Sequence, residues 1–437
     1  MVILKERMND QMDIHVVQPG ESLYSIAQAY GTTAARLAQD NELTPPYSLA
    51  VGQTIVVLYP RQVYTVTAGD TLEGIAERYG VTVNQLLRNN PQLNGLTGLV
   101  PGQVLVIDYA QQKQGEMAVN GYAYPYIDRQ VLRKTLPYLT YITLFTYGIT
   151  PEGGLIGIDD EEVIAIAKEY GVAPLMLVST LTEDGNFNNE LSSLVVNDPA
   201  VQERLINEIL AAIRAKGYYG LDIDFEFVRP EDRDAYTAFI RNVRERLNAE
   251  GYILVTALAP KTATDQPGLL YQGHDYAGIA AAANYVLLMT YEWGYTYGPP
   301  MAVAPINKVR EVLDYAVTQM APDKIFMGIP NYGYDWTLPF VRGESQARSL
   351  SNVAAVEQAV ARNAAISFDP VAQAPFYRYF DQGREHEVWF EDARSVNAKL
   401  ALIPEYGFEG ASYWNIMKYF PQNWLVLNSL YDIRKVL

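Results

Sequence analysis

One strand-like run, GLDIDFEF at residues 220–227, combines features that few folds can accommodate. Its acidic residues, Asp222, Asp224 and Glu226, alternate with apolar ones, and successive side chains of a β-strand point to opposite faces. One face is therefore acidic and the other is apolar. Such a strand suits a barrel whose outer face packs on helices and whose lumen opens to water at one end. We expect the three carboxylates to point into that lumen.

Eight β-rich runs follow residue 116 with helical segments between them, and this order predicts an α/β fold, a (β/α)8 TIM barrel over residues 117–437. The expected strands are residues 117–124, 139–147, 174–179, 220–227, 253–260, 285–291, 324–330 and 410–416. The helix after the fourth strand starts with Pro230 in its first turn and ends at Gly251. Residues 335–395, between strands seven and eight, are more than a barrel helix requires. They predict an α+β insertion that raises one wall of the cleft.

The composition restricts the chemistry that the chain can perform. A formal net charge of −17 argues against a nucleic-acid partner, because phosphate binding needs clustered Lys and Arg. The chain has no Cys and only three His, which lie far apart in the sequence, so we expect no metal site and no cofactor. Carboxylates, hydroxyls and amides remain as the catalytic groups.

Two copies of one pattern occupy the first hundred residues. Residues 16–33 repeat at 65–82 with an offset of 49, so that Gly20 corresponds to Gly69 and Tyr30 to Tyr79. Each copy begins with a short strand and a turn, continues with a helix of i, i+3, i+4, i+7 apolar spacing, and closes with a second strand. The pattern predicts two small βααβ units.

These units resemble LysM modules, which bind N-acetylglucosamine polymers such as peptidoglycan and chitin. The resemblance covers residues 14–58 and 63–108, and residues 109–116 then form the linker. It implies a sugar site between two loops of each module, at Gly20, Glu21, Ser22, Leu23 and Asn41 in the first and Gly69, Asp70, Thr71, Leu72, Asn90 and Pro91 in the second. The alternative for Ser22 and for Asp70 and Thr71 is simple helix capping.

The three acids of the GLDIDFEF run favour general acid catalysis. Like charges at this spacing repel one another and burial disfavours each anion, so at least one carboxyl should hold a proton near neutral pH. Two alternatives remain open at this point: a structural ion-pair site on a solvated strand, and a Mg²⁺ or Ca²⁺ site. A single line of ligands on one strand forms a cage around a cation less readily than ligands from several elements.

The DIDFE segment also matches the DxDxE signature of glycoside hydrolase family 18, and the chain resembles that family of chitinase-like barrels. The resemblance implies that Glu226 protonates the glycosidic oxygen, that Asp224 orients the substrate's 2-acetamido group, and that Asp222 supports Asp224. Tyr219 stands where the longer form of the signature has another Asp. In the family's substrate-assisted route the acetamido oxygen is the nucleophile, so a second catalytic carboxylate is not required and the anomeric configuration is retained.

Other strand ends agree with this resemblance. The MTYEW run at 289–293 implies that Tyr291 contacts the acetamido oxygen, and it carries Glu292 where the family has Asp. Trp414 corresponds to the Trp on which the sugar stacks. Further candidates for the cleft, for which core packing is the alternative, are Trp293, Tyr332, Tyr334 and Trp336.

Two LysM-like modules before such a barrel resemble the spore cortex-lytic glycosidases. The resemblance implies a monomeric N-acetylglucosaminidase that cleaves spore cortex peptidoglycan or its fragments. The alternatives are a chitinase and a non-catalytic sugar-binding protein. The first residues show no signal-peptide pattern and no apolar run could span a bilayer, so we expect no membrane insertion, synthesis in the mother cell and a place in the cortex or coat of the spore, associated with the wall.

Overall fold

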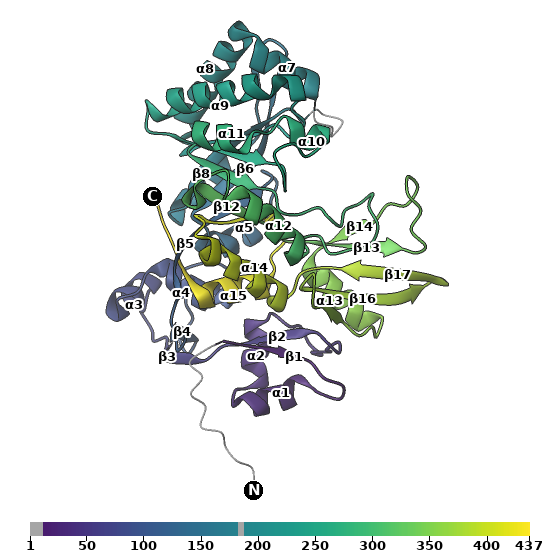
Figure 1. Ribbon diagram of the computed structural model, residues 1–437. Helices are drawn as coiled ribbons and strands as arrows, with labels where there is room; N and C mark the ends of the chain where they lie inside the picture. Colours follow the sequence, from purple (N-terminus) through teal and green to yellow (C-terminus); the bar gives the residue numbers. More distant parts are fainter. Residues whose placement is uncertain (1–11, 182–187) are drawn as a thin grey trace.

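The structure is a computed structural model that describes residues 12–181 and 188–437. Two small modules lie at one end of the molecule, a barrel of strands and helices forms its bulk, and a β-rich insertion projects from the side (Figure 1). We call residues 13–57 the first module and residues 60–109 the second module. No helix among the described residues is long and apolar enough to cross a membrane.

Eight parallel strands close into the predicted barrel. They follow one another as neighbours, and the last strand pairs with the first, with Gly410 opposite Ala118. The strands are β5 (Gly115–Ala123), β6 (Tyr141–Ile149), β8 (Ala173–Ser179), β9 (Gly220–Asp224), β10 (Ile253–Leu258), β11 (Tyr285–Leu288), β12 (Ile325–Pro330) and β18 (Gly410–Trp414). All eight expected runs are therefore barrel strands, and the TIM-barrel prediction is confirmed.

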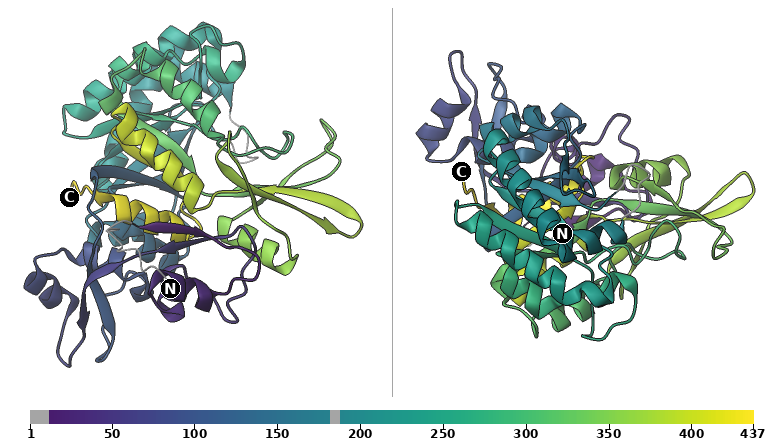
Figure 2. Two further views of the ribbon diagram at one scale, coloured as in Figure 1. Left: turned by 60° about the horizontal axis from the view of Figure 1, so that its bottom comes forward. Right: turned by 90° about the horizontal axis from the view of Figure 1, so that it is seen from above.

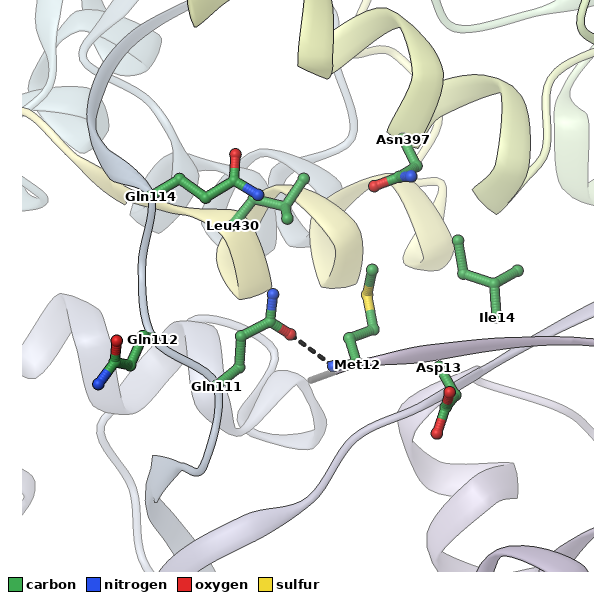
Figure 3. Close-up of a pocket in the computed structure, with 8 residues that line it drawn as sticks. All are labelled: Met12, Asp13, Ile14, Gln111, Gln112, Gln114, Asn397 and Leu430. Carbon is green, nitrogen blue, oxygen red and sulfur yellow. Dashed lines mark hydrogen bonds between the residues drawn. The ribbon is translucent and has the colours of Figure 1, made fainter. Parts of the chain in front are cut away.

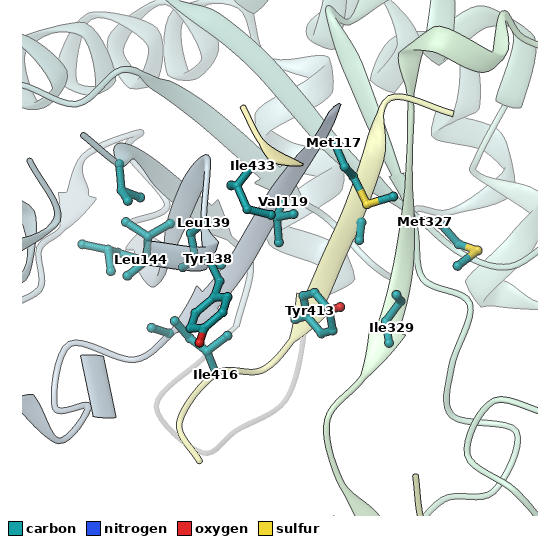
Figure 4. Close-up of a cluster of buried hydrophobic side chains, with 14 of the residues drawn as sticks. Met117, Val119, Tyr138, Leu139, Leu144, Met327, Ile329, Tyr413, Ile416 and Ile433 are labelled. Carbon is teal, nitrogen blue, oxygen red and sulfur yellow. The ribbon is translucent and has the colours of Figure 1, made fainter. Parts of the chain in front are cut away.

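Helices surround the barrel and cover its outer apolar face. They are α5 (Arg129–Thr135), α6 (Glu161–Glu169), α7 (Asn189–Asn197), α8 (Pro199–Lys216), α9 (Arg233–Asn248), α10 (Leu269–Gln272), α11 (Tyr276–Ala282), α12 (Ile306–Ala316), α14 (Ala393–Tyr406) and α15 (Pro421–Leu430). A short 3-10 turn, Pro230–Asp232, precedes α9, so the long helix begins three residues later than the sequence indicated. Figure 4 shows part of the outer core, where Met117 and Val119 of β5 lie near Tyr413 of β18 and Ile329 of β12.

Strand β9 is shorter than the predicted run and ends at Asp224. Its neighbours explain the difference, because the ladder to β8 ends at the pair Ser179 and Asp224, and the ladder to β10 ends one residue earlier. The apolar face still packs outward as expected, since the ring of Phe225 stacks on Tyr236 of α9 with 5.8 Å between centroids. Glu226 therefore lies on the loop beyond the strand, at the mouth of the barrel.

Inside the barrel, apolar side chains pack below and beside the acids. They include Tyr141 and Phe145 of β6, Leu175 and Leu177 of β8, and Phe326 of β12. Tyr219, the departure from the family signature, packs against these side chains, and its ring lies 6.0 Å from that of Tyr141. An aromatic side chain thus fills the space at the base of β9.

The insertion between β12 and β18 is a five-stranded antiparallel sheet with one helix on it. The strand order is β14-β13-β17-β16-β15. Its elements are β13 (Gly333–Thr337), β14 (Arg348–Leu350), α13 (Asn352–Ala361), β15 (Ser367–Asp369), β16 (Ala374–Asp381) and β17 (Arg384–Trp389). The sheet begins two residues before the predicted insertion and ends six residues before its predicted end, and α14 then returns the chain to the barrel.

Both modules have the predicted βααβ order. The first comprises β1 (Asp13–Val16), α1 (Leu23–Tyr30), α2 (Ala34–Asp40) and β2 (Thr54–Val57); the second comprises β3 (Pro60–Thr65), α3 (Leu72–Tyr79), α4 (Val83–Asn89), a 3-10 turn (Pro91–Leu93) and β4 (Val104–Tyr109). Helices α1 and α3 end at Gly31 and Gly80, which take the left-handed conformation that suits glycine.

The expected linker, residues 109–116, is not a free tether. Strand β4 includes Tyr109, and β5 begins at Gly115, where it pairs with the C-terminal strand β19 (Tyr431–Ile433). Between these strands the backbone N–H of Gln114 donates to Leu430 O at 2.7 Å. The side chain of Gln111 accepts from Met12 N at 2.6 Å beside a cavity of about 620 Å³ (Figure 3). The polar composition of residues 109–116 predicted a linker, and it gave no sign of these hydrogen bonds to residues that are distant in the sequence.

The second module is held on the barrel by a buried arginine. Arg88 of α4 donates from Nε to Asn428 Oδ1 of α15 at 3.0 Å and from Nη1 to Pro137 O at 3.1 Å. Burial lowers the pKa of Arg88 to about 10, a value at which it stays charged at neutral pH. The yellow helix α15 lies between the modules and the barrel strands (Figure 2).

The first module docks on the same helix and on the insertion. The side chain of Gln422 donates to Thr54 O at 2.5 Å and accepts from Thr54 Oγ1 at 2.6 Å. The backbone N–H of Ile366, in the insertion, donates to Val51 O at 2.8 Å. Both modules are therefore fixed to the barrel and its insertion by specific hydrogen bonds.

We expect Arg88→Ala to destabilise the whole chain by about 2–4 kcal/mol, because it leaves buried acceptors on Asn428 and Pro137 without a donor. Urea unfolding followed by circular dichroism measures this loss. Arg78→Ala, at a largely exposed position of the same module, is the matched control and should change stability by less than about 1 kcal/mol. Equal stability of the two variants would contradict a structural role for the buried arginine.

Candidate active site

The three acids become more exposed toward the mouth of the barrel. Asp222 is fully buried, Asp224 is 6% exposed and Glu226 is half-buried. The order follows from the strand, because β9 runs from the floor of the lumen toward the rim, and Glu226 lies just past its end. The acid nearest to solvent is thus the one that a substrate would meet first.

The two deeper acids are poorly compensated. Tyr122 of β5 donates its hydroxyl to Asp222 Oδ2 at 2.5 Å, while Asp222 Oδ1 and Asp224 Oδ1 have no hydrogen-bond partner. Burial raises the pKa of Asp222 to about 7. Burial also raises the pKa of Asp224 well above its usual range, and the charges of Glu226 and Asp222 raise it further. This environment matches the expectation that the acid run holds a proton near neutral pH.

Glu226 has the ionisation behaviour of a general acid. Its pKa is raised to about 7, first by burial and then by the negative charge of Glu292. A carboxyl with a pKa near the working pH can both donate a proton and take it back. Raised pKa values cluster at functional sites, and here they coincide with the open end of the barrel.

Glu292, whose role the sequence left in doubt, is held by two tyrosines. Both Tyr332 and Tyr334 donate their hydroxyls to its carboxylate, the latter at 3.0 Å from Oε1. The backbone of Glu292 has a φ of 68°, a conformation that few residues other than glycine adopt. Burial raises the pKa of Glu292 above its usual range, and the two donated hydrogen bonds oppose that rise by favouring the charged form.

Four of the expected cleft residues line one cavity of about 420 Å³. They are Trp414, Glu292, Tyr332 and Tyr334. The indole of Trp414 is held in place by aromatic neighbours, with ring centroids 5.1 Å from Phe145 and 5.5 Å from Tyr122. Tyr291 adjoins the cavity through its contacts with Tyr332 and Tyr334, and its pKa is raised by burial and by the charge of Asp224.

Two expected residues do not reach this cavity. Trp336 is 1% exposed, and its Nε1 donates to Gly298 O at 2.8 Å in the core of the insertion. Trp293 is half-buried and packs against the outer core of the barrel. Both indoles have the packing role that the sequence allowed as the alternative, because neighbouring elements enclose them.

Sequence reasoning missed two groups of residues around the site. Tyr122 comes from the first barrel strand, and its alternation within GYAY was the only signal that it faces the lumen. Tyr124, Tyr126 and Phe145 line a second cavity, of about 620 Å³. The ring of Tyr126 is 74% exposed and stacks on Tyr124 with 5.3 Å between centroids, which extends the aromatic surface away from Trp414.

In the modules, several expected sugar-binding side chains have structural roles. Leu23 and Leu72 are buried in the module cores, and Pro91 is buried at the start of a 3-10 turn. Asn41 bonds both backbone groups of Val56 at 2.8 Å, and Asn90 does the same with Val106. These amides fasten the closing strand of each module, so their side chains are not free to bind sugar.

The loops before α1 and α3 remain accessible. Ser22 and Thr71 cap the two helices, accepting from Ser25 N at 3.2 Å and Gly74 N at 3.1 Å. Glu21 and Asp70 fasten their own loops, by accepting from Gln18 N and Thr67 N at 2.7 Å. Gly20 and Gly69, with φ of 83° and 90°, have open space around them. The backbone of these loops is exposed, whereas most of the predicted side chains already have a partner.

The acid strand is not arranged as a cation cage. Among residues 12–181 and 188–437, no group of three or more His, Asp or Glu side chains could hold a metal ion. The geometry therefore favours proton transfer by carboxylic acids over the alternative of a Mg²⁺ or Ca²⁺ site.

A TIM barrel with raised-pKa acids at the end of its fourth strand is the arrangement of a barrel glycosidase. Comparison with known families agrees: Glycosyl hydrolases family 18 matches residues 178–418, and the LysM domain matches residues 15–58 and 64–108. The chain belongs to glycosyl hydrolases family 18 and carries two N-terminal LysM domains.

Whole proteins with the same organisation are known. The chain is 43% identical over 431 residues to the cortical fragment-lytic enzyme of Bacillus subtilis (strain 168), covering 97% of this chain and 99% of that protein. The crystal structure of the Bacillus cereus spore cortex-lytic enzyme SleL matches with a TM-score of 0.83 at 39% identity, covering 97% and 99% of the two chains. That of the Bacillus megaterium QM B1551 enzyme SleL matches with a TM-score of 0.82 at 38% identity, covering 98% and 99%.

We expect Glu292→Gln to shift the alkaline limb of the pH–rate profile toward lower pH by roughly one unit. Without the negative charge the pKa of Glu226 falls, so Glu226 loses its proton at a lower pH and the rate declines earlier as pH rises. Hydrolysis rates across pH 4–9, on the order of ten points per profile, measure the shift. Glu344→Gln, on an exposed loop of the insertion, should leave the profile unchanged. An unmoved limb in Glu292→Gln would contradict the coupling.

Proposed function

We propose that this chain is a retaining, substrate-assisted N-acetylglucosaminidase that cleaves spore cortex peptidoglycan or its fragments. The observation that carries the proposal is Glu226, a half-buried carboxyl with a pKa of about 7, whose charge raises the pKa of Asp224, a buried carboxyl with an Oδ1 that has no hydrogen-bond partner. A proton donor and a buried acceptor without a partner, close enough to interact electrostatically, fit a substrate that needs a proton on its leaving oxygen and a partner for an amide N–H.

The first step uses the proton of Glu226. The carboxyl transfers it to the glycosidic oxygen, the bond between that oxygen and the anomeric carbon breaks, and the carbonyl oxygen of the sugar's acetamido group bonds to the same carbon. Asp224 accepts a hydrogen bond from the acetamido N–H, and the hydroxyl of Tyr291 donates to the acetamido oxygen. The product of this step is a cyclic oxazolinium ion.

The second step reverses the role of Glu226. The carboxylate left by the first step takes a proton from water, the water oxygen bonds to the anomeric carbon, and the acetamido group is released. Two displacements at one carbon return its original configuration. Asp222, held by Tyr122 below Asp224, lets the pair share a proton as charge develops on the acetamido group.

The cleft supports binding of an N-acetylated sugar. Trp414 offers a flat ring for the sugar's CH face, and Glu292 and Tyr332 add polar groups to the lining of the same cavity. All of these residues come from one chain, and we propose that the monomer is the active form. The LysM domains support retention on an insoluble peptidoglycan or other N-acetylglucosamine polymer, since linked sites raise the local concentration of enzyme on its substrate.

The choice of cortex over chitin rests on the relatives. Proteins that are similar over nearly their full length bear the names cortical fragment-lytic enzyme and spore cortex-lytic enzyme. We propose the spore cortex as the place of action. Synthesis in the mother cell stays a prediction of the sequence.

The test is digestion of cortex fragments, vegetative peptidoglycan and chitin oligomers, with products identified by mass spectrometry. We expect wild type to cleave cortex material and Glu226→Gln to lose about 10²–10⁴-fold in kcat, because the amide can neither donate nor accept the catalytic proton. Glu231→Gln, at an exposed position of the same loop, is the matched control and should keep wild-type activity.

Each part of the proposal has its own contradicting result. Cleavage of chitin alone would contradict the cortex assignment, and inactivity on all three substrates would contradict hydrolysis. A product that first forms with inverted anomeric configuration, or equal cleavage of a substrate lacking the acetamido group, would contradict the substrate-assisted route.

A further inference from the structure

A groove adjoins the cavity that Trp414 and Glu292 line, and it reaches the first module. Its volume is about 530 Å³, within the range that holds a small ligand. One wall is the loop 41–48 between α2 and β2, and the opposite wall is helix α13 of the insertion. Of the sugar site that the LysM resemblance implies, only Asn41 lines the groove, and its amide is already bonded to Val56; the loop before α1 contributes no described lining residue.

The two cavities share part of their lining. Ser351 and Lys418 border both the groove and the cavity that holds Trp414 and Glu292. A chain leaving the catalytic cleft past these two residues therefore enters the groove directly. The groove continues the cleft toward the first module.

The walls of the groove offer the surfaces that a sugar ring needs. Val353, Val356 and Val360 form a half-buried stripe at helical spacing along α13, suited to the CH faces of a ring. Across from them Tyr47 keeps 40% of its surface exposed and has a φ of 61°, so the loop holds an aromatic ring out in an uncommon backbone conformation.

The floor contains a buried acceptor without a donor. Glu391 is 1% exposed; its Oε2 accepts from Lys399 at 2.8 Å, whereas its Oε1 has no hydrogen-bond partner. Glu357 and Asp392 also line the groove, against the single cation Lys418 among its described lining residues. Such a surface disfavours anionic peptide stems and suits a neutral group that carries O–H or N–H donors.

The groove is rigid because its walls are fastened together. Ala50 of the first module is buried in one cluster with Ala355 and Ala359 of α13, and the backbone bond from Ile366 to Val51 joins the same two parts. A site of fixed shape loses little conformational entropy when a ligand binds.

We propose that the neutral N-acetylated glycan strand in the catalytic cleft continues through this groove, so that the first module and the insertion bind the same chain that is being cleaved. The inference rests on the proposed function. It assigns a binding role to the face of the first module that meets α13, and no such role to the second module.

Full-length protein with Glu226→Gln serves for binding measurements, because it should not consume the ligand. Calorimetric titration compares N-acetylglucosamine disaccharide with oligomers of six or more sugars. Val356→Arg fills the groove, and Tyr47→Asn removes the ring while keeping a residue that tolerates positive φ. We expect both changes to weaken binding of the long oligomers about tenfold and to leave the disaccharide unaffected.

Val371→Arg is the matched control, since Val371 is 64% exposed on the same insertion and does not line the groove. It should bind both ligands as the parent does. Unchanged affinity of Tyr47→Asn for the long oligomers, or an equal loss for short and long ones, would overturn the inference. If Val356→Arg fails to fold, the affinity of Tyr47→Asn for the long oligomers is the test of the groove site.

Failure of the proposed function gives a different result. Wild type would then cleave neither short nor long glycans, while the groove variants could still lower the affinity for long oligomers. The opposite result is also distinguishable. If wild type cleaves the glycan but neither the parent nor any variant binds long oligomers more tightly than the disaccharide, the proposed groove site is wrong and the catalytic assignment stands.

Discussion

The cost of removing carboxylates from water governs the architecture of this protein. Asp222 and Asp224 lie inside a closed barrel where little solvent reaches them. The hydroxyl of Tyr122 donates to Asp222 Oδ2, whereas the Oδ1 atom of each side chain has no hydrogen-bond partner. A buried anion without partners is so unfavourable that the carboxyls retain protons near neutral pH.

The acid at the rim depends on a second layer of residues. Glu226 is tuned by Glu292, and Glu292 is in turn held by hydroxyls from Tyr332 and Tyr334 on the way into the insertion. The insertion therefore does more than raise a wall. Its tyrosines hold the side chain of Glu292, the charge of which raises the pKa of Glu226.

The two LysM domains diverge in structure although their sequences repeat. In the second, the loop after α4 packs on the barrel, where the hydroxyl of Tyr170 donates to Gly95 O at 2.5 Å. In the first, the corresponding loop carries Tyr47 and faces a groove next to the cleft. One copy thus contributes to attachment, and the other to the surface along which we propose that the substrate lies.

Much of this could be predicted from residue patterns alone. The eight strands, the βααβ repeats, the insertion and the acids of the DIDFE run follow from alternation and helical spacing, which are local properties of the chain. The end of β9, the docked segment before β5 and the burial of Trp336 could not be predicted, because each depends on which backbone or side chain lies opposite. The sequence by itself determined which carboxylates alternate along the fourth strand of the barrel. Only the tertiary structure decided their pKa values, their partners and the joining of the first module to the cleft, since desolvation and contact are properties of residues that are distant in the chain and meet in the fold.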